Sequence, residues 1–494
     1  MTETIRFLLN DRIEEVGACD PTLTVLDYLR EQKTMIGTKE GCAEGDCGAC
    51  TVVMAELHED GLRYRSVNSC IQLLASVDGK QLITVENLQP ASDELHPVQQ
   101  ALVDFHGSQC GFCTPGFVMS LFGMYHQDRD ETPDRNAINE ALAGNLCRCT
   151  GYAPIMRAAE HSLLAGRTDA FSENEAATIR SLVSINHDDM LAFEHEGRLY
   201  FSPANIDELC ELLSRHPDAC MVAGATDVGL WVTKNLQVLP VVIYLGNVRE
   251  LQEMTMDGDS GMLEIGAGVT YTDAMQTICD LYPGFREVML RLGGLQVRNA
   301  GTIGGNIANG SPIGDSPPGL IAANARLVLR SSSGSRDIAL EDFFIAYGKQ
   351  DLRVGECVEK ILLPLPGENT KFSTYKLSKR FDQDISAICG AYSLELDGDR
   401  VTALRIAYGG LAATPKRASN CENSLVGGAW DQAAVDRAKQ ALKQDFEPIS
   451  DMRASAAYRL SAAQNLLQRF FLESGEPEFP LRLSGQAWSD HAQA

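Results

Sequence analysis

The sequence predicts a multidomain α+β protein, and three observations carry this prediction. The 494 residues exceed the size at which one hydrophobic core keeps growing, and 44% of them are apolar, an ordinary share for a globular protein. Hydrophobic periodicity changes along the chain, from alternating strands through helices to a glycine-punctuated mixture of both. Eight of the fifteen cysteines form two sets within the first 150 residues, whereas the other seven are scattered singly.

Charge and cysteine content limit the possible partners and compartments. With 42 basic and 67 acidic residues, the formal charge of -25 would repel nucleic acid and anionic membranes. The start, "MTETIRFLLN", lacks the features of a signal peptide, and no apolar run reaches bilayer-spanning length, so we expect a cytosolic protein. Thiols stay reduced there, which makes metal ligation a better explanation of the clustered cysteines than disulfides.

Residues 1–84 are expected to form a small mixed sheet that carries one helix. Ile5, Phe7 and Leu9 alternate along the chain as in a half-buried strand. A short helix follows Thr24, whose hydroxyl is a suitable N-cap. The segments "CTVVMAEL" and "LRYRSVNSC" flank "HEDG" as the two strands of a hairpin.

The first cysteine set lies in this domain and indicates an iron-sulfur cluster. Its members, Cys42, Cys47, Cys50 and Cys70, reproduce the plant-type [2Fe-2S] spacing C-x4-C-x2-C…C. Glycines at 41, 45 and 48 let the loop curl tightly and bring backbone N–H groups close to cluster sulfurs.

The second cysteine set lies in a predicted helical bundle at residues 85–163. A C-x2-C pair is followed by a C-x-C pair, and each precedes a helix whose N-terminus would favour an anionic cluster. The ligands of this set are Cys110, Cys113, Cys147 and Cys149. Between the pairs we expect a helix with Thr132 as N-cap, Pro133 at its first position and Gly144 at its end.

Four cysteines also suit a structural zinc ion, which stays open as the alternative for both sets. Zinc ribbons usually carry two C-x2-C pairs, and neither set has that form, so iron-sulfur is favoured. We interpret the scattered cysteines as buried hydrophobic residues. The nine histidines lack metal-ligand spacing, and none is assigned a catalytic role.

The remaining chain divides into a polar linker at 164–192, an α+β domain at 193–370 and a C-terminal subdomain at 371–494. In the α+β domain, "NIDELCELLSRH" predicts a helix and "CMVAGATDVG" a strand that enters a tight turn at Gly224. Residues 293–315 hold seven glycines and no sustained periodicity, so this stretch is not expected to pack a core. It would instead bring backbone N–H groups against a diphosphate, with tight turns between strands as the alternative. No Rossmann fingerprint is present, because Tyr271 stands where "GAGVTY" would need a third glycine.

The two cysteine sets in this order, with "MVAGATDV" and "TIGGNIANGSPIGD" further on, resemble the xanthine dehydrogenase family of molybdenum hydroxylases. The resemblance spans nearly the whole chain. It implies a ferredoxin-like β-grasp [2Fe-2S] domain at 1–84, a helical-bundle [2Fe-2S] domain at 85–163, an α+β FAD-binding domain at 193–370 and a C-terminal α/β subdomain at 371–494. The family's molybdenum-binding portion has no counterpart in this sequence.

The same resemblance implies residue roles. Gln109 matches a glutamine that contacts the molybdopterin of the partner. No catalytic residue is assigned on this chain, because the flavin itself mediates hydride transfer. The implied FAD-binding residues are Met221, Val222, Ala223, Gly224, Ala225, Thr226, Asp227, Val228, Thr302, Ile303, Gly304, Gly305, Asn306, Asp315, Val358 and Lys376.

The function implied by the resemblance is electron transfer in an NAD-dependent xanthine dehydrogenase. A large molybdopterin-binding subunit would hydroxylate hypoxanthine and xanthine to urate. Electrons would then pass through two [2Fe-2S] clusters and FAD on this chain to the co-substrate NAD+. Two such heterodimers would form a heterotetramer. The alternatives are the redox subunit of another molybdenum hydroxylase, a molybdenum-independent iron-sulfur flavin reductase and a zinc-stabilised interaction protein.

Overall fold

The computed structural model describes residues 2–59, 61–88, 94–127, 133–164, 169–258 and 260–475. The chain divides into two compact units, the first made of residues 1–249 with 293–302 and the second of 250–292 with 303–494. We describe each unit by itself.

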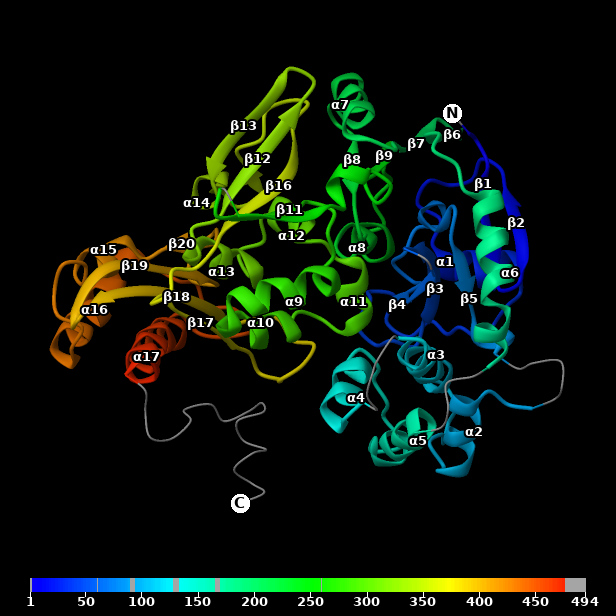
Figure 1. Ribbon diagram of the computed structural model, residues 1–494, viewed down its shortest axis with the longest axis horizontal. Coiled ribbons are helices and arrows are strands. Elements are labelled where there is room, and N and C mark those ends of the chain that lie inside the picture. The colour runs from blue at the N-terminus through cyan, green and yellow to red at the C-terminus, as the bar shows by residue number, and fades with distance from the viewer. Residues whose placement is uncertain are drawn as a thin grey trace. The chain divides into compact units, whose positions relative to one another are not determined.

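The first unit begins with a five-stranded mixed sheet in the order β2-β1-β5-β3-β4 (Figure 1). The strands are β1 (Ile5–Leu9), β2 (Arg12–Val16), β3 (Thr51–His58), β4 (Gly61–Asn68) and β5 (Gln81–Ile83). Strands β3 and β4 pair antiparallel, as the predicted hairpin requires, whereas β1 and β5 are parallel. Thr24 caps α1 (Val25–Asp27) by accepting the Asp27 N–H at 3.1 Å, and the helix continues as a π-helical turn at Tyr28–Gln32. The predicted mixed sheet and capped helix are therefore confirmed.

A group of helices follows, interrupted by the second cysteine set. They are α2 (Pro97–Asp104), α3 (Thr114–Tyr125), α4 (Arg135–Leu142) and α5 (Ala153–Leu164), with short 3₁₀ turns at Leu74–Val77 and Val85–Asn87 before them. Helix α3 is buried from Gly116 to its end because it packs on strands β3 and β4 as well as on α2 and α4. The predicted start of α4 is wrong: Asp134, whose carboxylate accepts the Ala137 N–H at 2.8 Å, is its N-cap, and Thr132 lies outside the described residues.

The segment expected to be a linker contains helix α6 (Ala170–Ile185). Its residues Leu182 and Ile185 pack with Leu8 of β1 in a small apolar cluster. Leu8 stands on the strand face that the alternation of Ile5, Phe7 and Leu9 left for solvent, and α6 covers it. At its other end, Phe171 packs against the core of the preceding helices, so two small apolar contacts hold α6.

The last part of the first unit is a four-stranded sheet in the order β6-β7-β9-β8 with helices α7, α8 and α11. Its elements are β6 (Leu191–His195), β7 (Arg198–Ser202), α7 (Ile206–Arg215), β8 (Cys220–Val222), α8 (Val228–Thr233), β9 (Val241–Tyr244) and α11 (Leu295–Ala300). One apolar core joins this sheet to the first one, since Tyr200 and Val242 belong to the same cluster as Phe7 and Tyr28. The predicted helix at α7 and strand at β8 are confirmed.

The second unit contains a sheet in the order β10-β11-β16-β12-β13, a sheet in the order β17-β18-β19-β20 and the short pair β14-β15. The strands are β10 (Met254–Asp257), β11 (Met262–Gly266), β12 (Arg326–Ser331), β13 (Gly334–Ala339), β14 (Phe344–Ala346), β15 (Lys349–Gln350), β16 (Cys357–Pro364), β17 (Lys371–Leu377), β18 (Ile388–Asp397), β19 (Arg400–Gly409) and β20 (Lys416–Arg417). The helices are α9 (Tyr271–Leu281), α10 (Arg286–Leu290), α12 (Ile303–Asn309), α13 (Ser316–Ala322), α14 (Leu340–Phe343), α15 (Ser419–Asn423), α16 (Gln432–Asp445) and α17 (Ala456–Ser474). Helices α16 and α17, both expected from their amphipathic pattern, share the apolar core of the second sheet.

The glycine-rich stretch 293–315 differs from the expectation that it packs no core. It forms α11 and α12, and it buries Gln296, Arg298, Asn299, Ile303 and Ile307. These helices are too short to show a period, and their glycines permit close packing. A Cβ on Gly304, for example, would lie 2.4 Å from the Cβ of Ala267.

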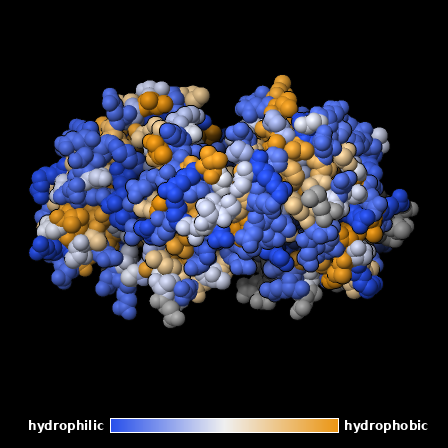
Figure 2. All heavy atoms as spheres, turned by 90° about the horizontal axis from the view of Figure 1, so that it is seen from above, coloured by the Kyte–Doolittle hydropathy of each residue, from blue (hydrophilic) through white to orange (hydrophobic). Residues whose placement is uncertain are grey.

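The remaining expectations concern cysteines and the surface. Of the scattered cysteines, Cys19 and Cys220 are half-buried and the other five are buried. Across the described part of the chain, no helix combines the length and the apolar character needed to span a bilayer. The face drawn in Figure 2 is largely hydrophilic, with apolar side chains in separate small groups.

Candidate functional site

The first cysteine set is gathered by the loop before β3 and by the residues after β4. The thiol of Cys42 hydrogen-bonds with those of Cys47 and Cys70, and the sulfurs of Cys50 and Cys70 lie 3.3 Å apart. The hydrogen bond from Cys47 holds the pKa of Cys42 well below its usual range, and one from Cys70 does the same for Cys50. The contacts therefore link all four thiols of this set into one group.

The second cysteine set is gathered at the N-terminal ends of α3 and α5. The sulfurs of Cys110 and Cys149 lie 3.4 Å apart, and Cys113 hydrogen-bonds with Cys147. Cys110 and Cys149 are exposed, whereas their two partners are half-buried. Gln109 is exposed beside them.

The sulfur contacts are compatible with iron-sulfur and with zinc. A tetrahedral zinc ion with Zn–S bonds of about 2.3 Å holds its sulfurs about 3.8 Å apart, and each iron of a [2Fe-2S] cluster binds two cysteines. The contacts between Cys50 and Cys70 and between Cys110 and Cys149 suit either arrangement. The spacing of the cysteines along the chain is what favours iron-sulfur.

The two cysteine loops also contact each other directly. The Leu146 N–H donates to the Cys47 carbonyl at 3.0 Å, so residues adjacent to both sets share a backbone hydrogen bond. Gly48, with φ of +70°, has its Cα close to the chain before Cys147, and a Cβ there would lie 2.2 Å from the Gly144 carbonyl oxygen. Only glycine fits this approach.

Sequence reasoning missed the side chains that surround this contact. Thr51, Ser120, Asn145 and Gln296 form one buried hydrogen-bonded group. They come from four separate parts of the chain, and a lone polar residue in each gives no sequence signal.

The predicted flavin residues divide between the two units. In the first unit, Met221 and Val222 end strand β8, and the chain then turns through Ala225, with φ of +57°, into α8. Gly224 approaches α11 so closely that a Cβ would lie 1.8 Å from the Ala300 carbonyl oxygen. Thr302 follows α11 and is buried. The segment 221–228 thus forms a tight backbone turn between β8 and α8.

In the second unit, Asp315 and Lys376 form an ion pair, although the sequence suggested them separately. The Lys376 Nζ lies 2.7 Å from Asp315 Oδ2, and the two side chains are 3% and 9% exposed. Ser386 also donates to Asp315, and Lys376 donates to the Arg291 carbonyl at 2.9 Å. The charges are therefore fully paired inside the protein.

The other flavin residues of the second unit lie on α12 and β16. Ile303 and Gly304 start α12, and Asn306 on that helix accepts a hydrogen bond from Ser316 at 2.9 Å. Val358 is buried in β16. Helix α12 has seven residues, and its glycines at 304 and 305 keep its first turn free of bulky side chains.

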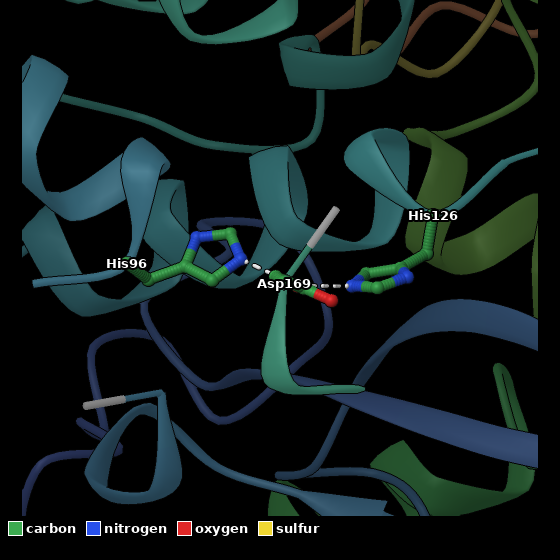
Figure 3. A group of neighbouring side chains, drawn as sticks. All are labelled: His96, His126 and Asp169. Atoms are coloured by element: carbon green, nitrogen blue, oxygen red, sulfur yellow. Dashed lines mark hydrogen bonds and ion pairs between the residues drawn. The ribbon is translucent and has the colours of Figure 1, made fainter. Parts of the chain in front are cut away.

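A second titratable cluster lies away from the cysteines, where Asp169 accepts hydrogen bonds from two histidines (Figure 3). His96 Nε2 and His126 Nε2 each lie 2.9 Å from Asp169 Oδ2, and all three side chains are buried. In the described part of the chain, this is the group of three potential ligand atoms that is compact enough for a metal ion.

Its hydrogen bonds favour a structural clamp over a metal site. His96 Nδ1 accepts the Val98 N–H at 3.2 Å, so a neutral His96 carries its proton on Nε2 and donates it to Asp169. A metal-bound histidine shows the reverse pattern, with its second nitrogen donating. Burial alone would raise the pKa of Asp169, but the hydrogen bonds from His126 and His96 outweigh it and hold that pKa well below its usual range. Because Asp169 also caps α6, the clamp fastens α6 to α2 and α3.

Comparison with known proteins adds family information to this geometry. Residues 8–73 match the 2Fe-2S iron-sulfur cluster binding domain, and 84–160 match the [2Fe-2S] binding domain. Residues 191–366 match the FAD binding domain in molybdopterin dehydrogenase, and 373–474 match the CO dehydrogenase flavoprotein C-terminal domain.

Curated relatives cover almost the whole chain. A xanthine dehydrogenase of Emericella nidulans is 32% identical over 95% of this chain and 38% of its own length. Xanthine dehydrogenase 2 of Arabidopsis thaliana is 31% identical over 86% of this chain and 36% of its own length. Aldehyde oxidase 4 of Cavia porcellus is 28% identical over 95% of this chain and 39% of its own length. The chain thus spans less than half the length of these relatives.

Solved structures match just over half of the chain. The carbon monoxide dehydrogenase of Hydrogenophaga pseudoflava gives a TM-score of 0.52 at 28% identity over 55% of this chain and 94% of the matched chain. Quinoline 2-oxidoreductase of Pseudomonas putida 86 gives a TM-score of 0.52 at 27% identity, over 57% of this chain and 99% of the matched chain.

Proposed function

The chain belongs to the molybdenum hydroxylase family, as its iron-sulfur and flavin portion, and from this premise we propose that it is the electron-transfer subunit of an NAD-dependent xanthine dehydrogenase. In this role it receives electrons from a molybdopterin-binding partner and delivers them to NAD+. The matches to two [2Fe-2S] domains and an FAD binding domain support two clusters and FAD on this chain. When bound, the clusters pass single electrons and the flavin combines two of them for hydride transfer.

The pairing of the thiols carries the proposal. Cys42, Cys47, Cys50 and Cys70 are the ligands of one cluster, and Cys110, Cys113, Cys147 and Cys149 are the ligands of the other. The support is the close approach of the sulfurs within each set together with the spacing of the cysteines along the chain. The hydrogen bond from Leu146 to Cys47 joins the two ligand loops, as sequential electron transfer needs.

The flavin contacts proposed are residues 221–228, Thr302 to Asn306, Asp315, Val358 and Lys376. The turn at Gly224 is the segment whose backbone N–H groups we assign to the phosphates. Lys376 is held by Asp315 and the Arg291 carbonyl, so its position is defined before the flavin binds.

The exposed residues around the second cysteine set support the presence of a partner subunit there. Cys110, Cys149 and Gln109 are exposed, and so are the apolar side chains of Phe112 and Tyr152 in the same loops, at 48% and 40%. A surface with exposed ligands and apolar neighbours fits a covering subunit. We propose that a large molybdopterin-binding subunit covers it, with Gln109 toward the pterin, and that two heterodimers form a heterotetramer.

Domain limits and compartment complete the proposal. The domains are residues 1–84, 85–163, 193–370 and 371–494, with 164–192 as the connection that carries α6. We place the protein in the cytosol, because a reducing compartment keeps fifteen free thiols from oxidising.

Assay of the purified native complex with xanthine and NAD+ tests the proposal. We expect urate and NADH to form together, and we expect four irons, no stoichiometric zinc and one FAD per chain. A colourless preparation with two zinc ions per chain would overturn the cluster assignment. A coloured complex that reduces NAD+ with other substrates but not with xanthine would overturn the substrate assignment alone.

A second candidate is the redox subunit of another molybdenum hydroxylase. Aldehyde oxidase 4 and quinoline 2-oxidoreductase are among the relatives of this chain, and the substrate pocket lies on the partner. Aldehydes, N-heterocycles and carbon monoxide offered to the same complex distinguish this candidate from xanthine dehydrogenase.

A further inference from the structure

Helix α11 contacts both cysteine loops through one buried amide. We propose that Gln296 on this helix positions the two loops relative to each other and thereby sets the geometry for electron transfer between the two clusters. The inference rests on the proposed cysteine ligand sets. Gln296 is a positioning residue, since it acts on the loops through Asn145 and Thr51.

The Gln296 amide lies in the middle of a polar network that water does not reach. Its side chain is almost completely buried, and Nε2 lies 2.9 Å from Asn145 Oδ1, 3.0 Å from Ser120 Oγ and 3.3 Å from Thr51 Oγ1. Asn145 stands two residues before Cys147, and Thr51 directly follows Cys50. One side chain therefore holds a neighbour of each cysteine set.

Those neighbours are in turn bonded to the backbone of the first cysteine loop. Asn145 Nδ2 donates to the Gly48 carbonyl at 3.1 Å, and the Thr51 hydroxyl donates to the same carbonyl at 2.7 Å. Gly48 lies between Cys47 and Cys50. Any shift of Gln296 is therefore transmitted to a carbonyl that both loops share.

The network fixes which way the Gln296 amide points. Asn145 Oδ1 already accepts from the Ser120 hydroxyl at 2.6 Å, so the group facing it from Gln296 must be a donor. A glutamate of the same shape would place an acceptor there. Gln296 Oε1 has no hydrogen-bond partner among the described residues.

The Gln296 side chain is closely packed against the backbone at Gly144. A Cβ on Gly144 would lie 1.8 Å from Gln296 Oε1, and the backbone conformation of Gly144 is one that any residue adopts, so close packing is what requires a glycine there. Electron transfer between two clusters slows as the distance between them increases. A displaced amide is thus expected to alter transfer between the clusters without removing either one.

The same helix supplies a matched control. Asn299 is also buried on α11, and its Nδ2 donates to the Ser66 carbonyl of β4 at 2.8 Å, away from both cysteine loops. Replacing Asn299 weakens the docking of α11, whereas replacing Gln296 removes the contact with the loops.

The test compares Gln296→Leu, Gln296→Glu and Asn299→Asp in the full chain within its purified complex. Low-temperature EPR of the fully reduced protein reports the line shape of each cluster and the magnetic interaction between them, and stopped-flow absorbance reports flavin reduction. We expect both Gln296 variants to keep four irons, to change the magnetic interaction and to reduce the flavin more slowly than the wild type does. We expect Asn299→Asp to retain the wild-type interaction.

Three results overturn the inference. The first is an unchanged magnetic interaction and an unchanged rate of flavin reduction in Gln296 variants that keep both clusters. The second is an equal change of these two quantities in Asn299→Asp, because the effect would then come from weaker docking of α11. If Gln296→Leu does not fold, the test uses Gln296→Glu and Gly144→Ala instead. The third result that overturns the inference is a wild-type magnetic interaction and a wild-type rate of flavin reduction in both of these variants. Absence of iron from the wild-type protein would instead refute the proposed function.

Discussion

The closest approach in the candidate flavin segment predicts the effect of adding one methyl group at Gly224. In Gly224→Ala, the new Cβ would lie 1.8 Å from the Ala300 carbonyl oxygen, 2.3 Å from its carbon and 2.8 Å from the Gly301 nitrogen. All three atoms belong to the backbone, so no side chain can rotate away. To bring the first contact from 1.8 Å to 3.0 Å, the turn and α11 must separate by roughly 1.2 Å.

The magnitude follows from the cost of overpacking. Forcing an extra methyl into a closely packed site costs about 1–3 kcal/mol. Gly224 has an ordinary φ, so this cost comes from the contact and not from backbone strain. If it falls on the FAD-bound conformation, the affinity for FAD decreases about 5- to 150-fold, since 1.4 kcal/mol corresponds to tenfold.

The assay is FAD binding to the deflavinated protein, followed by fluorescence, with iron content measured in parallel. We expect weaker FAD binding and unchanged iron, because none of the cysteines is altered. Gly17→Ala is the control, since a Cβ at that position meets nothing within 4 Å. Wild-type FAD affinity and thermal stability in Gly224→Ala would refute this reasoning.

Three further substitutions test other parts of the molecule. Cys149→Ser should abolish one of two cluster EPR signals and leave the other intact, and the loss of both or of neither contradicts the two ligand sets. Lys376→Met leaves Asp315 buried without its cation and should destabilise the second unit by about 3–5 kcal/mol in denaturant titrations; pairing it with Asp315→Asn should recover part of that loss. Asp169→Asn should destabilise by about 1–3 kcal/mol at pH 7. Because the folded pKa of Asp169 lies below its ordinary value of 3.8, the wild-type advantage is complete above about pH 4 and shrinks as the pH falls further, and a gap that does not depend on pH would contradict the clamp.

Much of the architecture is local enough to be predicted from the sequence. The spacing of Cys42, Cys47 and Cys50 lies within one loop, and the structure brings their thiols together with that of Cys70 as the spacing indicates. The alternation around Ile5, the N-cap at Thr24 and the hairpin at 51–68 are confirmed for the same reason: short-range geometry decides them. The boundary of α4 was missed because Thr132 and Asp134 are both good N-caps, and only the folded chain selects Asp134.

What the sequence determined by itself, then, is the cysteine sets and the elements with a clear local pattern, because hydrophobic period, caps and ligand spacing act over a few residues. Helices α6, α11 and α12 lack such a pattern and were missed. The tertiary structure alone decided which distant groups meet. It paired Asp315 with Lys376, joined His96 and His126 through Asp169, and placed Gln296 against Asn145. Each of these contacts joins residues tens to more than a hundred positions apart, where a buried polar group finds its partner only once the chain has folded and water is excluded.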